Sequence, residues 1–132
     1  MITNLKNVHD PENNCKIMKV LVIDDNVAVT DMLEGFLKLE GFDVSVSNDG
    51  KHGLNLIQNE NFDKILLDLS MPGFSGMDVL NALQNRFDMK KIHLFTAFSF
   101  SNAEENDFLK LGIRSILPKP VDLFELLYAL KN

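Results

Sequence analysis

The sequence has little cysteine and lacks tryptophan, with one cysteine and no tryptophan in 132 residues. Cys15 has no second cysteine to pair with, so an internal disulfide is excluded and a reducing compartment is expected. The sequence also lacks an apolar run of the roughly 20 residues that a membrane-spanning helix needs, and its polar N-terminus has no signal-peptide core. We therefore expect a soluble, cytoplasmic protein with no membrane contact.

Basic residues are also in short supply, because 13 lysines and arginines stand against 19 aspartates and glutamates and the net charge is −6. The longest basic run is Lys90-Lys91. Such a chain cannot neutralise many phosphates, so nucleic-acid binding is not expected. The length fits one domain with a substantial core, and 45% apolar residues are ordinary for a globular protein.

Short apolar runs alternate with helical patterns five times along residues 17–132. The runs predicted to be strands are 17–23, 42–46, 65–68, 92–95 and 115–117, and the helices cover about 29–37, 51–59, 77–86, 102–111 and 122–130. Strand–helix units with short connections give a parallel sheet with right-handed crossovers and helices on both faces. Residues 1–16 are polar and aperiodic, and we interpret them as a flexible lead-in to this α/β domain.

Polar and charged side chains stand at the ends of successive predicted strands. Asp24 and Asp25 end the first strand, Asp68 the third and Thr96 the fourth, and Lys119 follows the fifth. Because the carboxyl ends of parallel strands lie at one edge of a sheet, these side chains should converge. Three clustered carboxylates favour a hard divalent cation, for which Mg²⁺ is the best candidate. A lysine and a hydroxyl beside it would bind the remaining oxygens of a phosphoryl group.

Each of these residues also has a simpler explanation. Asp24 and Asp25 could cap the next helix, and Asp68 could form the turn that follows its strand. Thr96 alone is typical of a strand end, and Lys119 alone of a solvated loop. Their joint occurrence at successive strand ends, in this order, favours a functional site.

Four motifs resemble the receiver domain of two-component response regulators, and the stand-alone chemotaxis-type regulators in particular. They are Val22-Ile23-Asp24-Asp25, Leu66-Leu67-Asp68-Leu69-Ser70-Met71-Pro72-Gly73, Phe95-Thr96-Ala97 and Leu117-Pro118-Lys119-Pro120. The resemblance extends over residues 17–132. It implies a flavodoxin-like fold, in which a five-stranded parallel sheet of order 2-1-3-4-5 is flanked by five helices.

The resemblance also implies a role for each site residue. Asp68 would be the phosphoacceptor, taking a phosphoryl group from a histidine of a sensor kinase or phosphotransfer protein. Thr96 and Lys119 would each bind a phosphoryl oxygen. The bond between Lys119 and Pro120 is expected to be cis, an isomer that is common only before proline.

A magnesium site is implied at the same place. Asp25, Asp68 and the backbone carbonyl of Ser70 would ligate Mg²⁺ directly, while Asp24 would act through a bound water.

One position departs from the family pattern. Ile116 stands three residues before Lys119, where the family has a tyrosine or phenylalanine that turns inward when phosphorylation draws the threonine toward the phosphate. Either the backbone after Thr96 carries the read-out, or Phe98 or Phe100 substitutes, or both phenylalanines merely pack on the next helix. Phe98 also stands where a bulky apolar group would hinder water and slow hydrolysis.

Three further side chains lie outside the motifs. Phe124 and Tyr128 are four residues apart on the last helix, off its leucine face. They either cover the edge of the fold or form a partner surface with the fourth helix and Ile116, and we favour the partner surface. His93 lies in a predicted strand and is expected to be a core or edge histidine with satisfied hydrogen bonds.

The expected function is that of a single-domain response regulator, a monomer or weak dimer, that signals by phosphorylation-controlled protein contact and is not an enzyme toward other substrates. A phosphorelay intermediate is an alternative. A binding module that works without phosphorylation also stays open, because of Ile116. A metal-dependent phosphatase is disfavoured, because the second position after Asp68 is Ser70 and not the aspartate that such enzymes use as acid and base.

Overall fold

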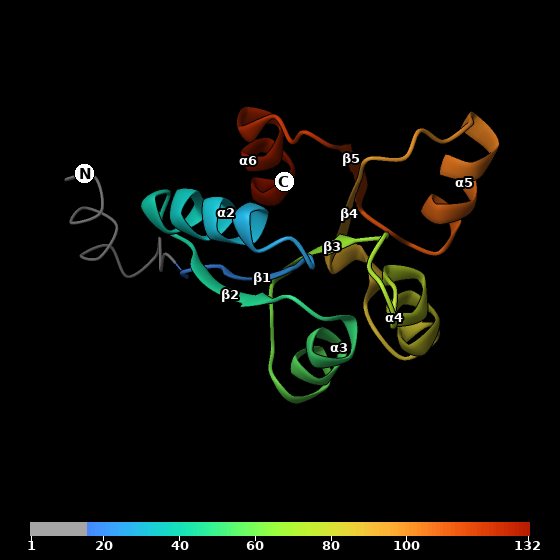
Figure 1. Ribbon diagram of the computed structural model, residues 1–132, viewed down its shortest axis with the longest axis horizontal. Helices are drawn as coiled ribbons and strands as arrows, with labels where there is room; N and C mark the ends of the chain where they lie inside the picture. The colour runs from blue at the N-terminus through green and yellow to red at the C-terminus, as the bar shows by residue number, and fades with distance from the viewer. Residues whose placement is uncertain (1–15) are drawn as a thin grey trace.

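The computed structural model describes residues 16–132, so the predicted lead-in lies outside the described residues except for Lys16 (Figure 1). In chain order the elements are β1 (Lys19–Ile23), α2 (Val27–Leu39), β2 (Asp43–Ser47), α3 (Gly50–Asn59), β3 (Lys64–Asp68), α4 (Gly76–Leu83), the 3-10 helix η2 (Met89–Lys91), β4 (Ile92–Thr96), α5 (Asn102–Lys110), β5 (Ser115–Pro118) and α6 (Leu123–Lys131). None of the helices in this range is long and apolar enough to span a membrane.

The strands form one parallel sheet of five in the order β2-β1-β3-β4-β5, which confirms the predicted topology. Ile23 of β1 lies opposite Leu67 of β3, and Asp68 lies opposite Phe95 of β4. The inner strands are almost wholly buried, as expected when helices cover both faces of a parallel sheet. The edge strand β2 has an exposed first residue, Asp43.

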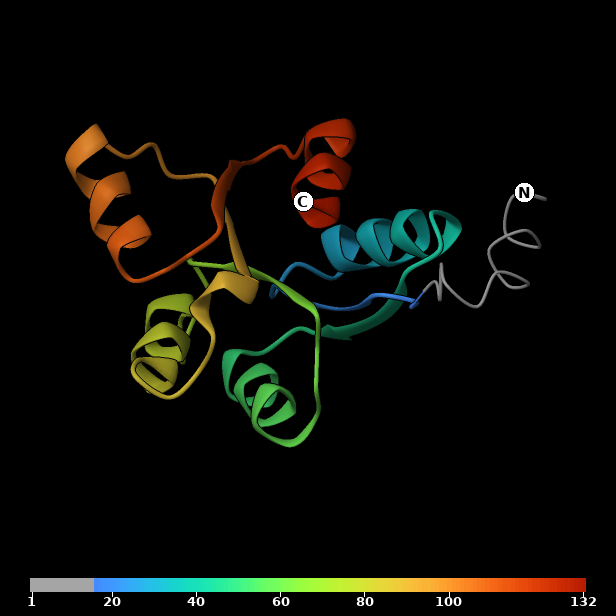
Figure 2. The same ribbon diagram turned by 180° about the vertical axis from the view of Figure 1, so that it is seen from behind.

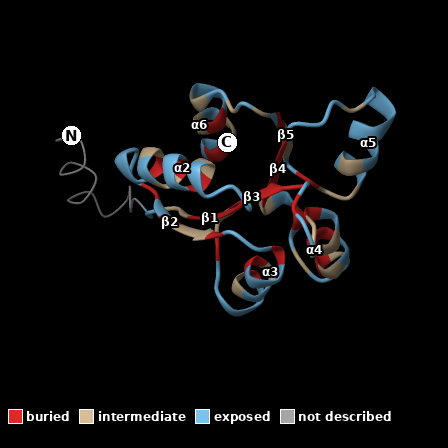
Figure 3. Ribbon diagram, viewed as in Figure 1, coloured by how far each residue is buried: buried red, intermediate tan, exposed pale blue. Residues whose placement is uncertain are grey.

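Helices cover the sheet on both faces, and the core is therefore split into two apolar layers. α2 and α6 lie on one face, and α3 and α4 lie on the other, as the two opposite views show (Figures 1 and 2). Val22 and Phe95 belong to the apolar layer between the sheet and the first pair of helices, together with Leu126 of α6. Ile23 and Leu67 belong to the layer between the sheet and the second pair. α5 has no fully buried residue, and it is exposed along most of its length (Figure 3).

Each α-helix begins at a polar side chain that accepts a hydrogen bond from the first turn. These residues are Asn26, Asp49, Ser75, Ser101 and Asp122. In α4 and α5 the third helical residue, Asp78 or Glu104, also accepts from the capping residue's own N–H, forming a capping box. The caps satisfy backbone N–H groups that have no partner within the helix, and they fix where each helix leaves the sheet.

Several predicted boundaries differ from the observed ones by one to three residues, and one predicted face is wrong. The first strand begins at Lys19, later than expected, and the N–H of Lys19 bonds the carboxylate of Asp63. α4 ends at Leu83 because Asn85 takes a left-handed conformation with φ of 67°. The helical apolar spacing of Met32 and Leu33 predicts that both face the core, but Met32 is 46% exposed and Thr30 is buried instead.

Candidate functional site

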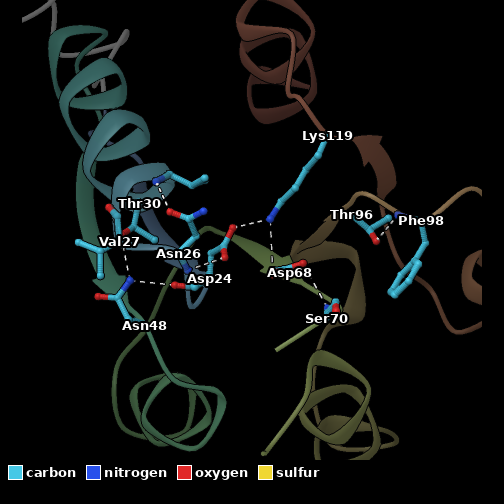
Figure 4. Close-up of polar contacts among 11 residues, drawn as sticks. Asp24, Asn26, Val27, Thr30, Asn48, Asp68, Ser70, Thr96, Phe98 and Lys119 are labelled. Carbon is cyan, nitrogen blue, oxygen red and sulfur yellow. Dashed lines mark hydrogen bonds and ion pairs between the residues drawn. The ribbon is translucent and has the colours of Figure 1, made fainter. Parts of the chain in front are cut away.

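The carboxyl ends of four strands carry the predicted site residues to one edge of the sheet (Figure 4). Asp24 directly follows β1, and Asp68 is the last residue of β3. Thr96 is the last residue of β4, and Lys119 directly follows β5. The parallel topology alone produces this convergence, because every strand runs toward the same edge.

Three carboxylates meet at this edge. One oxygen each of Asp24, Asp25 and Asp68 lies within 4.8 Å of the other two. Asp24 and Asp68 are buried, whereas Asp25 is exposed. An all-oxygen donor set with an open side suits a hard divalent cation that keeps several of its waters, which is the usual binding mode of Mg²⁺. The residues present therefore fit a magnesium site.

Lys119 supplies the positive charge of the site. Its Nζ lies 2.6 Å from Oδ2 of Asp24 and 3.5 Å from Oδ2 of Asp68. The same ammonium lies 4.7 Å from the centre of the Phe95 ring, an arrangement that favours a cation. The backbone N–H of Lys119 donates to the carbonyl of Thr96, and the bond to Pro120 is cis, as predicted. These contacts aim the lysine across the edge of the sheet toward β1 and β3.

The carboxyl of Asp68 holds its proton more tightly than an ordinary aspartate. Burial raises its pKa from 3.8 to about 6, and the nearby charge of Asp24 acts in the same direction. The backbone N–H of Ser70, which donates to Oδ1 of Asp68 over 3.2 Å, and the ammonium of Lys119 oppose this shift in pKa. A cation bound among these carboxylates would favour the ionised form of Asp68.

The loop after Asp68 is held close to the strand by two glycines. Gly73 has φ of 75°, a left-handed conformation that suits the turn after Pro72. A Cβ on Gly76 would collide with the backbone carbonyl of Asp68, so only glycine lets α4 start against the end of β3. Ser70, in the loop directly after β3, is exposed.

The hydroxyl of Thr96 is engaged away from the carboxylates. Thr96 is buried, and its Oγ1 accepts a hydrogen bond from the backbone N–H of Phe98 over 3.1 Å (Figure 4). The hydroxyl proton is left for another acceptor. Thr96 therefore lies at the expected edge, but its side chain belongs to the loop that leads to α5.

Asn48 is a supporting residue that the sequence did not reveal. Its side-chain amide donates to the carbonyl of Asp24 over 2.8 Å and to Oγ1 of Thr30 over 2.9 Å. The N–H of Asn26 also donates to Oδ1 of Asp24 over 2.9 Å. In the sequence, Asn48-Asp49-Gly50 is typical of a turn and indicates no role for Asn48. The one available signal is Thr30, a polar residue on the otherwise apolar buried face of α2, which needs a hydrogen-bond partner.

The remaining side chains singled out from the sequence lie outside the carboxylate cluster. His93 is buried with Nδ1 2.6 Å from Oγ of Ser115, but its Nε2 has no partner among residues 16–132, so the expected satisfied histidine is only half satisfied. Phe124 and Tyr128 are exposed and line a groove of about 590 Å³ between β5 and α6, together with Ile116. This arrangement agrees with an exposed surface and not with a cover over the fold.

Comparison with known proteins places this doubly wound domain and its acidic edge in one family. The sequence model of the response regulator receiver domain matches residues 20–131. The receiver domain of the Francisella response regulator 1452 is 30% identical with a TM-score of 0.79, over 86% of this chain and 93% of that one. Vibrio cholerae chemotaxis protein CheY4 is 27% identical with a TM-score of 0.77, over 88% and 98% of the two chains. A CheY-like receiver domain protein from Methanospirillum hungatei is 27% identical with a TM-score of 0.79, over 88% and 92%.

The chain therefore belongs to the response regulator receiver domain family of two-component signalling. This confirms the resemblance drawn from its four sequence motifs. Receiver domains generally bind Mg²⁺ at an acidic pocket, and in this chain that pocket is the cluster of Asp24, Asp25 and Asp68. They also interact in general with histidine kinases and with downstream targets.

Proposed function

We propose that this receiver domain accepts a phosphoryl group on Asp68 from a phosphohistidine of a sensor kinase or phosphotransfer protein, and that the phosphorylated form acts by contacting a partner protein. The observation that carries the proposal is the convergence of Asp24, Asp25 and Asp68 within 4.8 Å, with Lys119 on two of them. An acceptor carboxylate, a cation site and a fixed ammonium are the parts that phosphoryl transfer requires.

The transfer balances without a separate catalytic base. A carboxylate oxygen of Asp68 attacks phosphorus, a P–O bond forms as the P–N bond of phosphohistidine breaks, and the leaving imidazole nitrogen takes the electron pair. Asp68 must be ionised to attack. Because its pKa is raised to about 6, it is mostly ionised at neutral pH even without a cation.

The magnesium site would be built from the acidic cluster. Asp25, Asp68 and the backbone carbonyl of Ser70 would hold the ion directly, and Asp24 would hold it through a water. When bound, Mg²⁺ offsets the negative charge that builds up on the transferring phosphoryl oxygens. Asn48 and the N–H of Asn26 keep the Asp24 end of this site in place.

Lys119 and Thr96 would hold the phosphoryl group once it is attached. Lys119 already lies 3.5 Å from Oδ2 of Asp68, so its ammonium needs little movement to reach a phosphoryl oxygen. Thr96 has a hydroxyl proton to donate at the neighbouring strand end. We propose no activity toward other substrates, because Ser70 occupies the position where aspartyl phosphatases carry a second aspartate.

The output would be protein–protein contact in the cytoplasm. The exposed face formed by α5, β5 and α6, where Phe124 and Tyr128 border the groove beside Ile116, is the proposed target surface of a monomer or weak dimer. A phosphorelay intermediate is the alternative, and transfer back from Asp68 to a histidine protein distinguishes the two. A docking regulator gains partner affinity on phosphorylation, whereas a relay protein exchanges the phosphoryl group rapidly in both directions.

Intact-mass measurement after incubation with Mg²⁺ and a small-molecule phosphodonor tests the proposal. The parent should gain one phosphoryl group, while Asp68→Asn and the parent in EDTA should gain none. Asp43→Asn, which removes an exposed carboxylate far from the acidic cluster, is the matched control and should behave as the parent. A parent that gains no phosphoryl group under any condition would support the phosphorylation-independent binding module instead.

A further inference from the structure

A second groove lies on the opposite side of α5 from the proposed target surface. α4 and α5 enclose about 340 Å³ lined by Met77, Phe100, Glu104, Asp107, Phe108 and Leu111. α5 has no fully buried residue, so this groove is bordered by a helix that uses little of its surface for the fold (Figure 3). The partly buried Phe100, Phe108 and Leu111 form the base of the groove, and the exposed carboxylates of Glu104 and Asp107 form its rim.

A column of aromatic rings connects the groove to the phosphoacceptor edge. The ring centres of Phe100 and Phe108 are 5.2 Å apart, and those of Phe98 and Phe100 are 6.4 Å apart. The column ends at Phe98, which is 58% exposed and whose backbone N–H donates to Oγ1 of Thr96. The Thr96 hydroxyl is therefore hydrogen-bonded directly to the residue that ends the column.

The negative charge of α5 indicates which kind of segment can bind in this groove. The helix carries Glu104, Glu105 and Asp107 against a single Lys110, and Glu104 and Asp107 themselves line the groove. A second copy of the same acidic face would be repelled, which disfavours a symmetric dimer through this surface. A segment with an apolar anchor and flanking lysines or arginines complements both the base and the rim.

We propose that the groove between α4 and α5 is a docking site for a basic partner segment carrying an apolar or aromatic anchor. The anchor packs on Met77 and Phe108, and the basic residues face Asp107. The second part of the proposal rests on the proposed phosphorylation of Asp68. Binding in the groove is coupled to the phosphoryl group through Thr96, Phe98 and the aromatic column. Phosphorylation draws the Thr96 hydroxyl toward the phosphoryl oxygens, shifts Phe98 away from Phe100 and opens the groove.

Fluorescence anisotropy with two labelled peptides tests the docking site. One is a short peptide of leucine, phenylalanine and lysine, and the other has glutamate in place of lysine. The lysine peptide should bind the parent and bind Asp107→Lys about fivefold more weakly. Glu105→Lys makes the same charge change on the same helix outside the groove lining, so its affinity should stay close to that of the parent.

Two outcomes would overturn the docking site. Equal weakening by both charge reversals means general attraction to an acidic protein, and equal binding of the glutamate peptide means that the rim selects nothing. Asp107→Asn, measured in parallel with circular dichroism of each variant, separates a lost contact from a lost fold.

The coupling is tested by repeating the titration with Mg²⁺ and a phosphodonor. The parent should bind the lysine peptide more tightly in proportion to the phosphorylated fraction found by mass, and Phe98→Ala should show a smaller gain per phosphoryl group. A phosphorylated parent with unchanged affinity would contradict the coupling. A parent that never becomes phosphorylated would instead contradict the proposed function, and leave the comparison of Asp107→Lys with Glu105→Lys to decide the docking site by itself.

Discussion

The Nζ atom of Lys119 lies 2.6 Å from Oδ2 of Asp24, although the two residues are 95 positions apart in the sequence. Asp24 has no exposed surface, and the side chain of Lys119 is 21% exposed. The pair joins the ends of β1 and β5, which are not neighbours in the sheet, so it passes over the ends of the two strands between them. Lys119 thereby places a positive charge beside two buried carboxylates, whose burial without a partner would be costly.

Replacing Lys119 should destabilise the folded state, because the buried carboxylates then lose their cationic partner. Lys119→Met is expected to lower the free energy of unfolding by about 2–4 kcal/mol in EDTA, because it leaves buried charges unpaired. Mg²⁺ should restore part of the loss, since a ligand of the folded state stabilises it. Urea denaturation with and without Mg²⁺ measures both effects. Lys16→Met, which removes an exposed ion pair with Asp63, should cost less than about 1 kcal/mol, and equal losses in the two variants would contradict the prediction.

The raised pKa of Asp68 predicts a stability that depends on pH. The pKa is 3.8 in the unfolded chain and about 6 in the folded one, so the folded state takes up the proton first as the pH falls. The contribution of Asp68 to stability is therefore fully present below about pH 4 and is lost as the pH rises through 6, by about 2–3 kcal/mol in the absence of metal. Asp68→Asn should be more stable than the parent at pH 7 in EDTA, and the difference should vanish near pH 4. A constant difference across this range would contradict the assignment.

His93 predicts the opposite dependence. Burial, followed by the charges of Lys64 and Arg114, lowers its pKa from 6.5 to about 4. The unfolded chain therefore takes up the proton first, and the stabilising contribution of neutral His93 is present above pH 6.5 and lost as the pH falls toward 4, by about 3 kcal/mol. Denaturation of the parent and His93→Leu between pH 7 and pH 4 should show a shallower decline for the variant. Identical slopes would exclude His93 as the cause.

Phe98 is predicted to slow the loss of the phosphoryl group. Its exposed ring extends from the loop beside the phosphoacceptor edge, where it would restrict the approach of water. Phe98→Asn should lose the phosphoryl group about two- to tenfold faster than the parent when followed by intact mass after removal of the donor. Phe124→Asn, at an exposed position on α6, should keep the rate of the parent, and an unchanged half-life in Phe98→Asn would end the shielding hypothesis.

Two glycines provide a matched test of the close approach of α4 to β3. Gly76→Ala should lower the free energy of unfolding by more than about 2 kcal/mol, because the new Cβ collides with the backbone carbonyl of Asp68. Gly35→Ala in α2 meets no atom within 4 Å and should raise stability by about 0.5–1 kcal/mol. Denaturation of both variants measures the two effects, and a neutral Gly76→Ala would show that the loop after β3 can move.

The fold could be predicted from the sequence because its strands and helices carry different apolar periods. The inner strands are covered on both faces, so they read as short continuous apolar runs, and each is followed by a helix with one apolar face. This order of elements is enough to define a parallel sheet, and a parallel sheet is enough to bring Asp24, Asp68 and Lys119 to one edge. The strand order and the residue roles came from the resemblance to a family.

The details that the sequence did not reveal depend on contacts between distant segments or on the local backbone. Asn48 reads as part of a turn, and its bond to the carbonyl of Asp24 exists only because β2 lies beside β1. α4 ends early through the left-handed conformation of Asn85, which no apolar period records. The hydrogen bond from the N–H of Phe98 to Thr96 depends on the orientation of the threonine side chain at the strand end. The pattern of residues in the sequence does not determine that orientation.

The low burial of α5 has a consequence for the cooperativity with which the domain unfolds. A helix without a fully buried residue contributes few apolar contacts, so it can open locally at a small fraction of the free energy of global unfolding. Its amide hydrogens should then exchange with solvent well before those of β1, β3 and β4. The domain is thus expected to combine a rigid sheet, which fixes the carboxylates, with one helix that opens while the sheet stays intact.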